Sequence, residues 1–145
     1  MSELQRTHQW NIVSGNEFKE DTELFYLYWD LIKEEFNELL EAKTREEVLD
    51  ALGALYVVVT GELHSMKVNA GDLLKRINDS NFSKFDTTEA DAKISVAAYE
   101  NDERYENIHY EKVGGYYVIR GDKVGGAKNK ILKSHKYTEP ELSDL

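Results

Sequence analysis

The chain has 145 residues, of which 41% are hydrophobic and 32% charged, and this composition fits one soluble globular domain with its own core. A net charge of −10 argues against binding to the phosphate backbone of a nucleic-acid polymer, although a small nucleotide is still compatible because a bound metal reverses the local charge. The absence of cysteine excludes disulfides, zinc–thiolate sites and a cysteine nucleophile.

The first 21 residues are polar with scattered apolar side chains, which predicts a short helix followed by a turn at Gly15 and Asn16. This segment does not have the apolar core of a signal peptide. No apolar run in the chain is expected to reach the length of a membrane span. We therefore expect a cytoplasmic protein without a membrane partner.

Residues 23–42 are predicted to form an amphipathic helix. A rotation of about 100° per residue brings six apolar side chains onto one side, namely Leu24, Leu27, Tyr28, Leu31, Ile32 and Leu39. Glu35 and Glu38 fall within this apolar stripe, and Glu34 and Glu41 lie at its margin. Carboxylates on a core-facing surface repel each other and lose hydration, and a divalent cation would relieve both penalties. The alternative is that this end of the helix is a solvent-exposed acidic face.

A second helix is predicted from Thr44, which forms a capping box with Glu47, to about Met66. Its residues are apolar on almost every side, and this pattern predicts a central buried helix. Glu47, Asp50 and Ala54 share one face of it, so two carboxylates project together near its start.

The connection at residues 43–44 is short, so we expect the two helices to be antiparallel neighbours whose acids meet at one end. Four carboxylates facing one another across two helices would form an oxygen cage suited to Mg²⁺, with Mn²⁺ also possible. The capping box alone explains Glu47 without a metal, but nothing comparable explains Asp50.

Further helices are predicted at residues 72–79 and 88–101, the latter with Ala90, Ile94, Ala97 and Ala98 inward. Beyond them the apolar period changes to two in residues 108–113 and 116–120, which flank two glycines and predict a β-hairpin. Residues 130–133 are expected to add a third strand. The fold class is therefore mainly α, an antiparallel helical bundle with a small C-terminal β-hairpin extension. We expect one domain over residues 1–145, with a helical core at about 23–101 and the hairpin and tail at about 106–145.

Three segments in this order resemble the all-α nucleoside triphosphate pyrophosphohydrolases, the superfamily of MazG, dimeric dUTPases and phosphoribosyl-ATP pyrophosphohydrolase. Residues 31–39 (LIKEEFNEL) are similar to the Glu-Glu-x-x-Glu helix, and residues 47–58 (EVLDALGALYVV) are similar to the second motif helix. Residues 80–84 (SNFSK) resemble the Ser-Asn-x-Ser-Lys segment of the small phage-type branch, which is followed by a short hairpin and a tail like residues 130–140. The resemblance covers roughly residue 24 to the C-terminus.

The resemblance implies an enzyme that uses Mg²⁺ to hydrolyse a nucleoside triphosphate (NTP or dNTP) to the monophosphate and pyrophosphate. It implies a homodimer or homotetramer. The implied catalytic residues are Glu34, Glu35 and Glu38, of which Glu34 would orient the attacking water or bind a second ion. The implied metal ligands are Glu35, Glu38, Glu47 and Asp50. The implied nucleotide-binding residues are Asn81, Ser83, Lys84 and Tyr56, although small polar groups and a lysine are also ordinary at a helix C-terminus.

One position departs from the family pattern, because Ala54 stands where members usually carry a metal-binding aspartate. Either Glu47 and Asp50 complete the cage, or one ligand is missing and the protein is weakened or inactive. In the second case it would be a nucleotide-binding or sequestering protein on the same scaffold. A third class, a helical interaction module, would leave Glu35 and Glu38 on the core-facing stripe without a partner.

Overall fold

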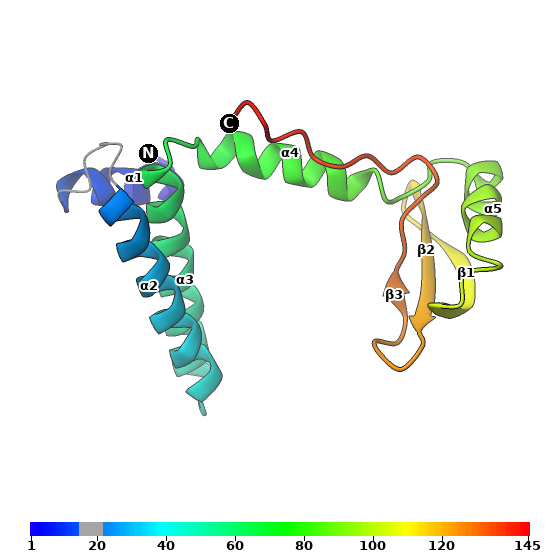
Figure 1. Cartoon of the computed structure of the whole chain (residues 1–145), viewed down its shortest axis with the longest axis horizontal. Helices are drawn as coiled ribbons and strands as arrows, with labels where there is room; N and C mark the ends of the chain where they lie inside the picture. Colours follow the sequence, from blue (N-terminus) through cyan, green and yellow to red (C-terminus); the bar gives the residue numbers. More distant parts are fainter. Residues whose placement is uncertain (15–21) are drawn as a thin grey trace. The chain divides into compact units, whose positions relative to one another are not determined.

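The computed structural model describes residues 1–14 and 22–145, and it divides into two compact units, Met1–Leu73 and Leu74–Asp144 (Figure 1). The described residues form five helices and a three-stranded antiparallel sheet, which confirms the prediction of a mainly helical fold with a C-terminal β extension. The expected turn at Gly15 and Asn16 lies outside the described residues.

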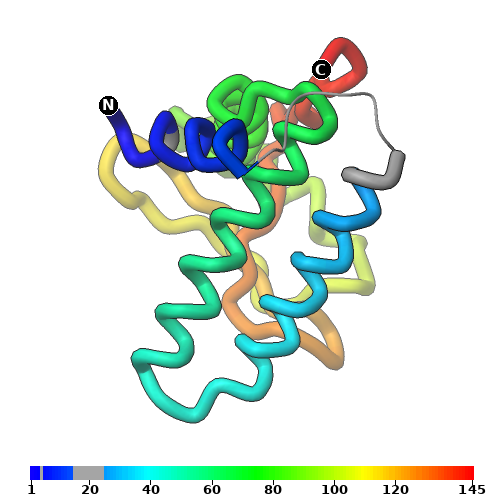
Figure 2. The backbone as a smooth tube through the Cα atoms, turned by 90° about the vertical axis from the view of Figure 1, so that its left-hand side faces the viewer, coloured from blue at the N-terminus to red at the C-terminus, as the bar shows by residue number. Residues whose placement is uncertain are grey.

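The first unit contains helices α1 (Glu3–Val13), α2 (Thr22–Glu41) and α3 (Arg45–Ser65). α2 and α3 lie side by side and antiparallel, joined by a short turn (Figure 2), and α1 packs on α3. α3 begins where the sequence predicts, at an N-cap formed by Thr44 with Glu47 as its capping-box partner.

Tyr28 of α2 forms the centre of the packing between these helices. Its side chain is only 3% exposed, and its hydroxyl donates a hydrogen bond to Oδ1 of Asn11 on α1 over 3.0 Å. The ring lies against Gly61 of α3, where a Cβ atom would be 2.2 Å from Cε1 of Tyr28. A glycine at this position therefore permits the close approach of α2 and α3.

The prediction that α3 is buried on almost every side was wrong for the isolated chain. Its buried residues are Ala51, Gly61, Glu62 and Ser65. Four of its large apolar side chains are 42% to 57% exposed, namely Leu49, Leu52, Tyr56 and Val59. α1 and α2 cover only one side of α3, and the apolar pattern of a helix does not specify what covers the rest. On α2, Leu27 is likewise exposed although it belongs to the predicted stripe.

By length and composition alone, α3 is apolar enough to cross a membrane, in contrast to the expectation from the sequence. One such helix is weak evidence for a membrane span, because core helices of soluble proteins pass the same test. Glu62 near the end of α3 is a buried carboxylate, which would be costly in lipid.

The second unit contains most of α4 (Ala70–Phe82), then α5 (Glu89–Ala98) and strands β1 (Tyr105–Val113), β2 (Tyr116–Lys123) and β3 (Lys130–Ile131). The strand order is β1-β2-β3, and β1 and β2 form the predicted hairpin. Gly114 in its turn has a φ of 59°, which favours glycine. α5 packs on β1 and β2, with Ala92, Ile119 and Leu132 at the centre of the core.

The predicted inward face of α5 was wrong. Ala92 and Ser95 are fully buried, whereas Ile94 is 52% exposed. Ser95 is buried because its hydroxyl donates to Oδ2 of Asp86, whose Oδ1 accepts from the hydroxyl of Ser134. These hydrogen bonds satisfy a buried polar cluster that an apolar pattern does not reveal.

We expect Gly61→Ala to lower the free energy of unfolding by about 1–3 kcal/mol, because the new methyl group would overlap the ring of Tyr28. Gly53→Ala in the same helix is the matched control, since no atom lies within 4 Å of its added Cβ. That change should increase the free energy of unfolding by about 0.5–1 kcal/mol through helix propensity alone. Urea unfolding followed by circular dichroism measures both, and equal effects of the two substitutions would contradict the packing described above.

Candidate active site

The turn between α2 and α3 is held by the side chain of Glu47. Its Oε2 accepts hydrogen bonds from the backbone N–H of Lys43 over 2.7 Å and of Thr44 over 3.2 Å. The hydroxyl of Thr44 in turn accepts from the backbone N–H of Glu47. The two backbone donors lower the pKa of Glu47, so this carboxylate is ionised at neutral pH.

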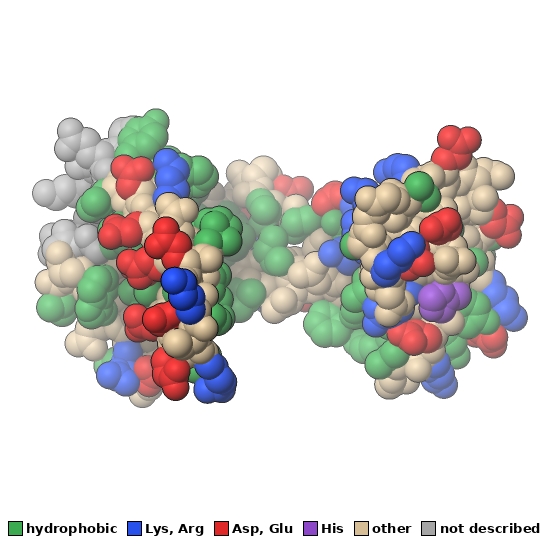
Figure 3. All heavy atoms as spheres, turned by 90° about the horizontal axis from the view of Figure 1, so that it is seen from below, with side chains coloured by type: hydrophobic (Ala, Val, Ile, Leu, Met, Phe, Trp, Pro, Cys, Tyr) green, Lys and Arg blue, Asp and Glu red, His purple; other side chains and the backbone are tan. Residues whose placement is uncertain are grey.

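A cavity of about 360 Å³ opens beside this turn. It is lined by Glu38 and Glu41 of α2, Ala42 and Lys43 of the turn, and Glu47 and Asp50 of α3. Acidic side chains gather over this face of the helical unit (Figure 3). The antiparallel packing therefore brings Glu38, Glu47 and Asp50 to one cavity, as the sequence predicts, and adds Glu41, which was placed only at the margin of the stripe.

Glu35 lies one turn before Glu38 on α2 and is half-buried. Burial raises its pKa, and the charges of Glu38, Glu34 and Asp50 raise it further. Glu35 thus interacts electrostatically with carboxylates of both helices. Together with the cavity that acids of both helices line, this interaction indicates that the carboxylates of α2 and α3 form one electrostatic cluster.

The donor atoms of this cluster suit Mg²⁺, which prefers carboxylate oxygens, and a cation would neutralise the repulsion that raises the pKa of Glu35. Among residues 1–14 and 22–145, however, no three His, Asp or Glu side chains are arranged to hold a metal ion. The cage predicted from the sequence is therefore present as a cluster of charges and not as closed coordination geometry. Glu34 is exposed, and Ala54 is partly buried one turn after Asp50.

The residues predicted to contact nucleotide fall in both units. Tyr56 of α3 is 57% exposed in the first unit. In the second unit, Nζ of Lys84 donates to Oδ1 of Asn81 over 2.8 Å. The hydroxyl of Ser83 donates to the carbonyl of Ser80 and accepts from the backbone N–H of Thr138. Ser83 therefore has a structural role in attaching the C-terminal tail, and its predicted contact with nucleotide stays a prediction.

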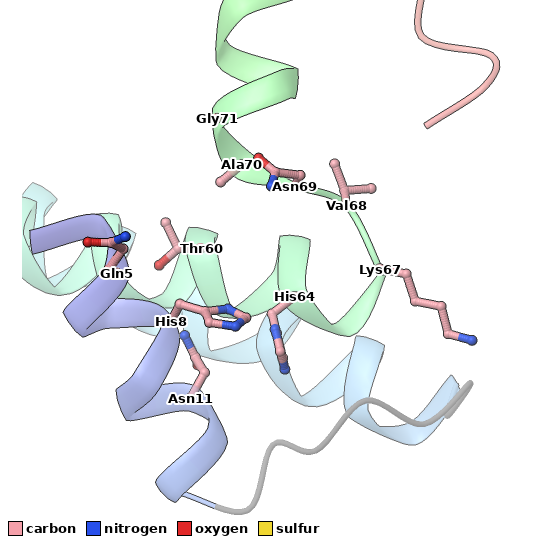
Figure 4. A pocket seen from close by; sticks show the side chains of 10 residues that line it. All are labelled: Gln5, His8, Asn11, Thr60, His64, Lys67, Val68, Asn69, Ala70 and Gly71. Atoms are coloured by element: carbon pink, nitrogen blue, oxygen red, sulfur yellow. The ribbon is translucent and has the colours of Figure 1, made fainter. Parts of the chain in front are cut away.

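A second cavity, of about 380 Å³, was not predicted from the sequence (Figure 4). It lies where α1, the end of α3 and the start of α4 meet, all within the first unit. His8 and His64 lie together in its wall, with ring centroids 5.0 Å apart and nearly perpendicular planes. The two histidines are 56 positions apart in the chain, so no local spacing could have indicated that they meet.

The raised pKa of Glu35 predicts that Glu35→Gln increases the melting temperature at pH 7. A folded-state pKa above the unfolded value means that ionisation of Glu35 destabilises the fold, so stability is lost as the pH rises through the folded pKa. The gain should disappear below about pH 4, where the unfolded carboxyl is protonated as well. Thermal unfolding in a metal chelator at both pH values measures it.

Glu47→Ala is the contrasting control, because the folded-state pKa of Glu47 is lowered. Its stabilising effect is present above the unfolded pKa and is lost as the pH falls through the folded pKa. This substitution should therefore lower the melting temperature at pH 7. If Glu35→Gln and wild type melt together at pH 7, the acids of α2 and α3 do not interact in solution.

Comparison with known families identifies the chain from its helical part. A family model described as phosphoribosyl-ATP pyrophosphohydrolase (PRA-PH) matches residues 4–81, more than half of the chain. The matched region contains the acids of α2 and α3 and ends before Ser83 and Lys84. Comparison with curated proteins and with solved structures gave no match. The chain therefore belongs to the PRA-PH family, a member of the all-α nucleoside triphosphate pyrophosphohydrolase superfamily.

Proposed function

We propose that this protein hydrolyses a nucleoside triphosphate to the monophosphate and pyrophosphate with the help of Mg²⁺. The observation that carries the proposal is the cavity at the α2–α3 turn, which is lined by Glu38 and Glu41 of α2 and by Glu47 and Asp50 of α3. The match to a family of pyrophosphohydrolases supports the reaction class.

In this proposal Glu35, Glu38 and Asp50 hold the metal, and the free oxygen of Glu47 contributes where the cap allows. Bound Mg²⁺ would screen the phosphate oxygens and lower the pKa of a water molecule. Glu34 is exposed at the edge of the cluster, where its carboxylate can accept a proton from the attacking water. Asn81, Ser83 and Lys84 would contact phosphate or ribose, and Tyr56 would contact the base.

We also propose that the protein acts as a homodimer or homotetramer in the cytoplasm. The support for an oligomer is the apolar surface of the helical unit, where exposed side chains lie on both α2 and α3. On α2 they are Tyr26, Leu27, Trp29, Phe36 and Leu40, and on α3 they are Leu49, Leu52, Tyr56 and Val59. A monomer that left this surface in water would carry an unusually large apolar patch.

A second function is a nucleotide-binding or sequestering protein with little or no turnover. Two observations favour it: Ala54 offers no ligand, and one oxygen of Glu47 is engaged by the helix cap. Saturable nucleotide binding without pyrophosphate release would select this function.

We expect Glu38→Gln to reduce magnesium-dependent pyrophosphate release by about 100-fold or more, because a metal ligand contributes several kcal/mol to the transition state. The apo protein should stay folded, since glutamine keeps the shape and removes one charge from a repulsive cluster. The measurement is pyrophosphate release from a panel of NTPs and dNTPs with and without Mg²⁺. Glu46→Gln is the matched control, because Glu46 is an exposed acid in the first turn of α3 that does not line the cavity. Equal activity of the Glu38 variant and wild type would contradict the role of Glu38 as a metal ligand.

We expect Ala54→Asp to increase pyrophosphate release by about tenfold and to tighten Mg²⁺ binding, since it returns a carboxylate one turn beyond Asp50. Gly53→Asp adds the same charge at the neighbouring exposed position and should not increase turnover. A different result is expected in the alternative arrangement, in which Glu47 and Asp50 already complete the cage. The fifth acid would then lower the melting temperature without a gain in turnover or metal affinity, and that result would contradict our expectation.

A further inference from the structure

Two lysines from distant parts of the chain meet at the ring of Tyr137 in the second unit. Nζ of Lys133 lies 4.1 Å from the ring centroid, and Nζ of Lys84 lies 6.0 Å from the same centroid. Lys84 follows the end of α4, and Lys133 and Tyr137 belong to the C-terminal tail, which runs along α4 (Figure 1). Two ammonium groups at one ring repel each other, although each is attracted to the face of the ring.

Backbone and hydroxyl hydrogen bonds hold this arrangement. The backbone N–H of Ser134 donates to the carbonyl of Lys84 over 3.1 Å. The hydroxyl of Ser80 donates to the carbonyl of Thr138 over 2.8 Å, and the N–H of Thr138 donates to the hydroxyl of Ser83 over 3.0 Å. The tail is therefore attached on both sides of Tyr137, and the two lysines are positioned by the fold.

Glu139 is the carboxylate that meets these cations. Its Oε1 accepts from Nζ of Lys133 over 3.1 Å, and its Oε2 accepts from the hydroxyl of Tyr137 over 2.8 Å. These hydrogen bonds lower the pKa of Glu139, and the charge of Lys84 lowers it further. The carboxylate of Glu139 therefore interacts with the hydroxyl of Tyr137 and with both lysines.

The local charges do not balance. Lys84 donates to Oδ1 of Asn81, a neutral acceptor, so two cations share the single negative charge of Glu139. The Glu139 side chain is 74% exposed, and an exposed ion pair of this kind contributes little to stability. A phosphate group offers more charge and more acceptor oxygens than a carboxylate at the same donors.

We propose that Lys84, Lys133 and the hydroxyl of Tyr137 form a binding subsite for a polyphosphate chain, and that Glu139 accepts from Lys133 and Tyr137 until the ligand displaces it. The identification of the ligand as a nucleoside triphosphate rests on the proposed function, whereas binding of a polyphosphate does not. Lys133 and Tyr137 are thereby added to Lys84 as residues that bind phosphate, and Glu139 is the carboxylate that competes with it.

The subsite is tested by titration calorimetry on the full chain with inorganic triphosphate, in a metal chelator and at fixed ionic strength. We expect Lys133→Gln to weaken binding about tenfold, since it removes a charge-assisted hydrogen bond. Lys93→Gln is the matched control, because Lys93 is an exposed lysine of the same unit that pairs with Glu89 on α5. It removes the same charge and should change binding less than about twofold.

Glu139→Gln should have the opposite effect and strengthen triphosphate binding several-fold, because it removes the competing negative charge. A purely structural role for the Lys133–Glu139 pair would not give opposite signs for the two substitutions. Melting temperatures measured on the same samples identify any variant that does not fold. A Tyr137→Phe variant, which keeps the ring and loses the hydroxyl, then provides a second measurement and should also weaken binding.

The subsite is overturned if wild type does not bind inorganic triphosphate, if Lys93→Gln weakens binding as much as Lys133→Gln, or if Glu139→Gln weakens it. The same titrations with deoxyadenosine triphosphate identify the source of the phosphate chain: a matching loss in Lys133→Gln supports a nucleotide, and a loss for inorganic triphosphate alone supports a free polyphosphate. Binding with this mutational pattern but no pyrophosphate release in Mg²⁺ would support the subsite and contradict the proposed activity. If wild type releases pyrophosphate but Lys133→Gln leaves triphosphate binding unchanged, the proposed activity is supported and the subsite is contradicted.

Discussion

The arrangement of the acids depends on one local interaction, the acceptance of two backbone N–H groups by the carboxylate of Glu47. These bonds close the turn at Lys43 and Thr44 and begin α3, so that α3 runs back along α2. Because the helices are antiparallel from this point, Asp50 of α3 lies near Glu35 and Glu38 of α2. A cap of this kind contributes about 1 kcal/mol to a helix, yet here it also determines which carboxylates meet.

The opposite end of the α2–α3 pair supplies the packing that the acidic end does not provide. Tyr28 lies against Gly61 and is fixed by its hydrogen bond to Asn11, so a large buried ring joins all three helices of the first unit. At the acidic end, burial and then the charges of neighbouring carboxylates raise the pKa of Glu35. The repulsion lies at one end of the helix pair and the close packing at the other, so the proposed binding site is separated from the main source of stability.

The sequence predicted the features that depend on neighbouring residues. The capping box at Thr44, the antiparallel pair and the β1–β2 hairpin are set by spacings of two to four residues, and each is confirmed. The features that it missed depend on distant partners. Ser95 is buried because Asp86 accepts its hydrogen bond, and Asp86 also binds Ser134, which is 48 positions away. An apolar pattern predicts that a polar side chain faces water, and only the folded chain supplies the partner that reverses this. The exposure of α3 was missed for the same reason, because the periodicity of apolar residues predicts a helix but not which elements pack against it.

In the proposed site Glu47 would have two roles, because it caps α3 and would also bind the metal. Lowering the pKa keeps this carboxylate ionised, as a metal ligand must be, but the donors that lower it also withdraw charge from the oxygens. In the proposed metal site, Glu47 would therefore be a weaker ligand than Asp50, whose side chain is exposed at the same cavity. An aspartate at position 54 would make the weakness of a capping glutamate matter little in the proposed site, because a full ligand would then stand one turn beyond Asp50. With Ala54 in that place, metal binding in the proposed site would depend on Glu35, Glu38 and Asp50, and the burial and neighbouring charges that raise the pKa of Glu35 would oppose its ionisation as the pH falls. Without a carboxylate at position 54, metal binding in the proposed site would therefore depend more strongly on the protonation of Glu35.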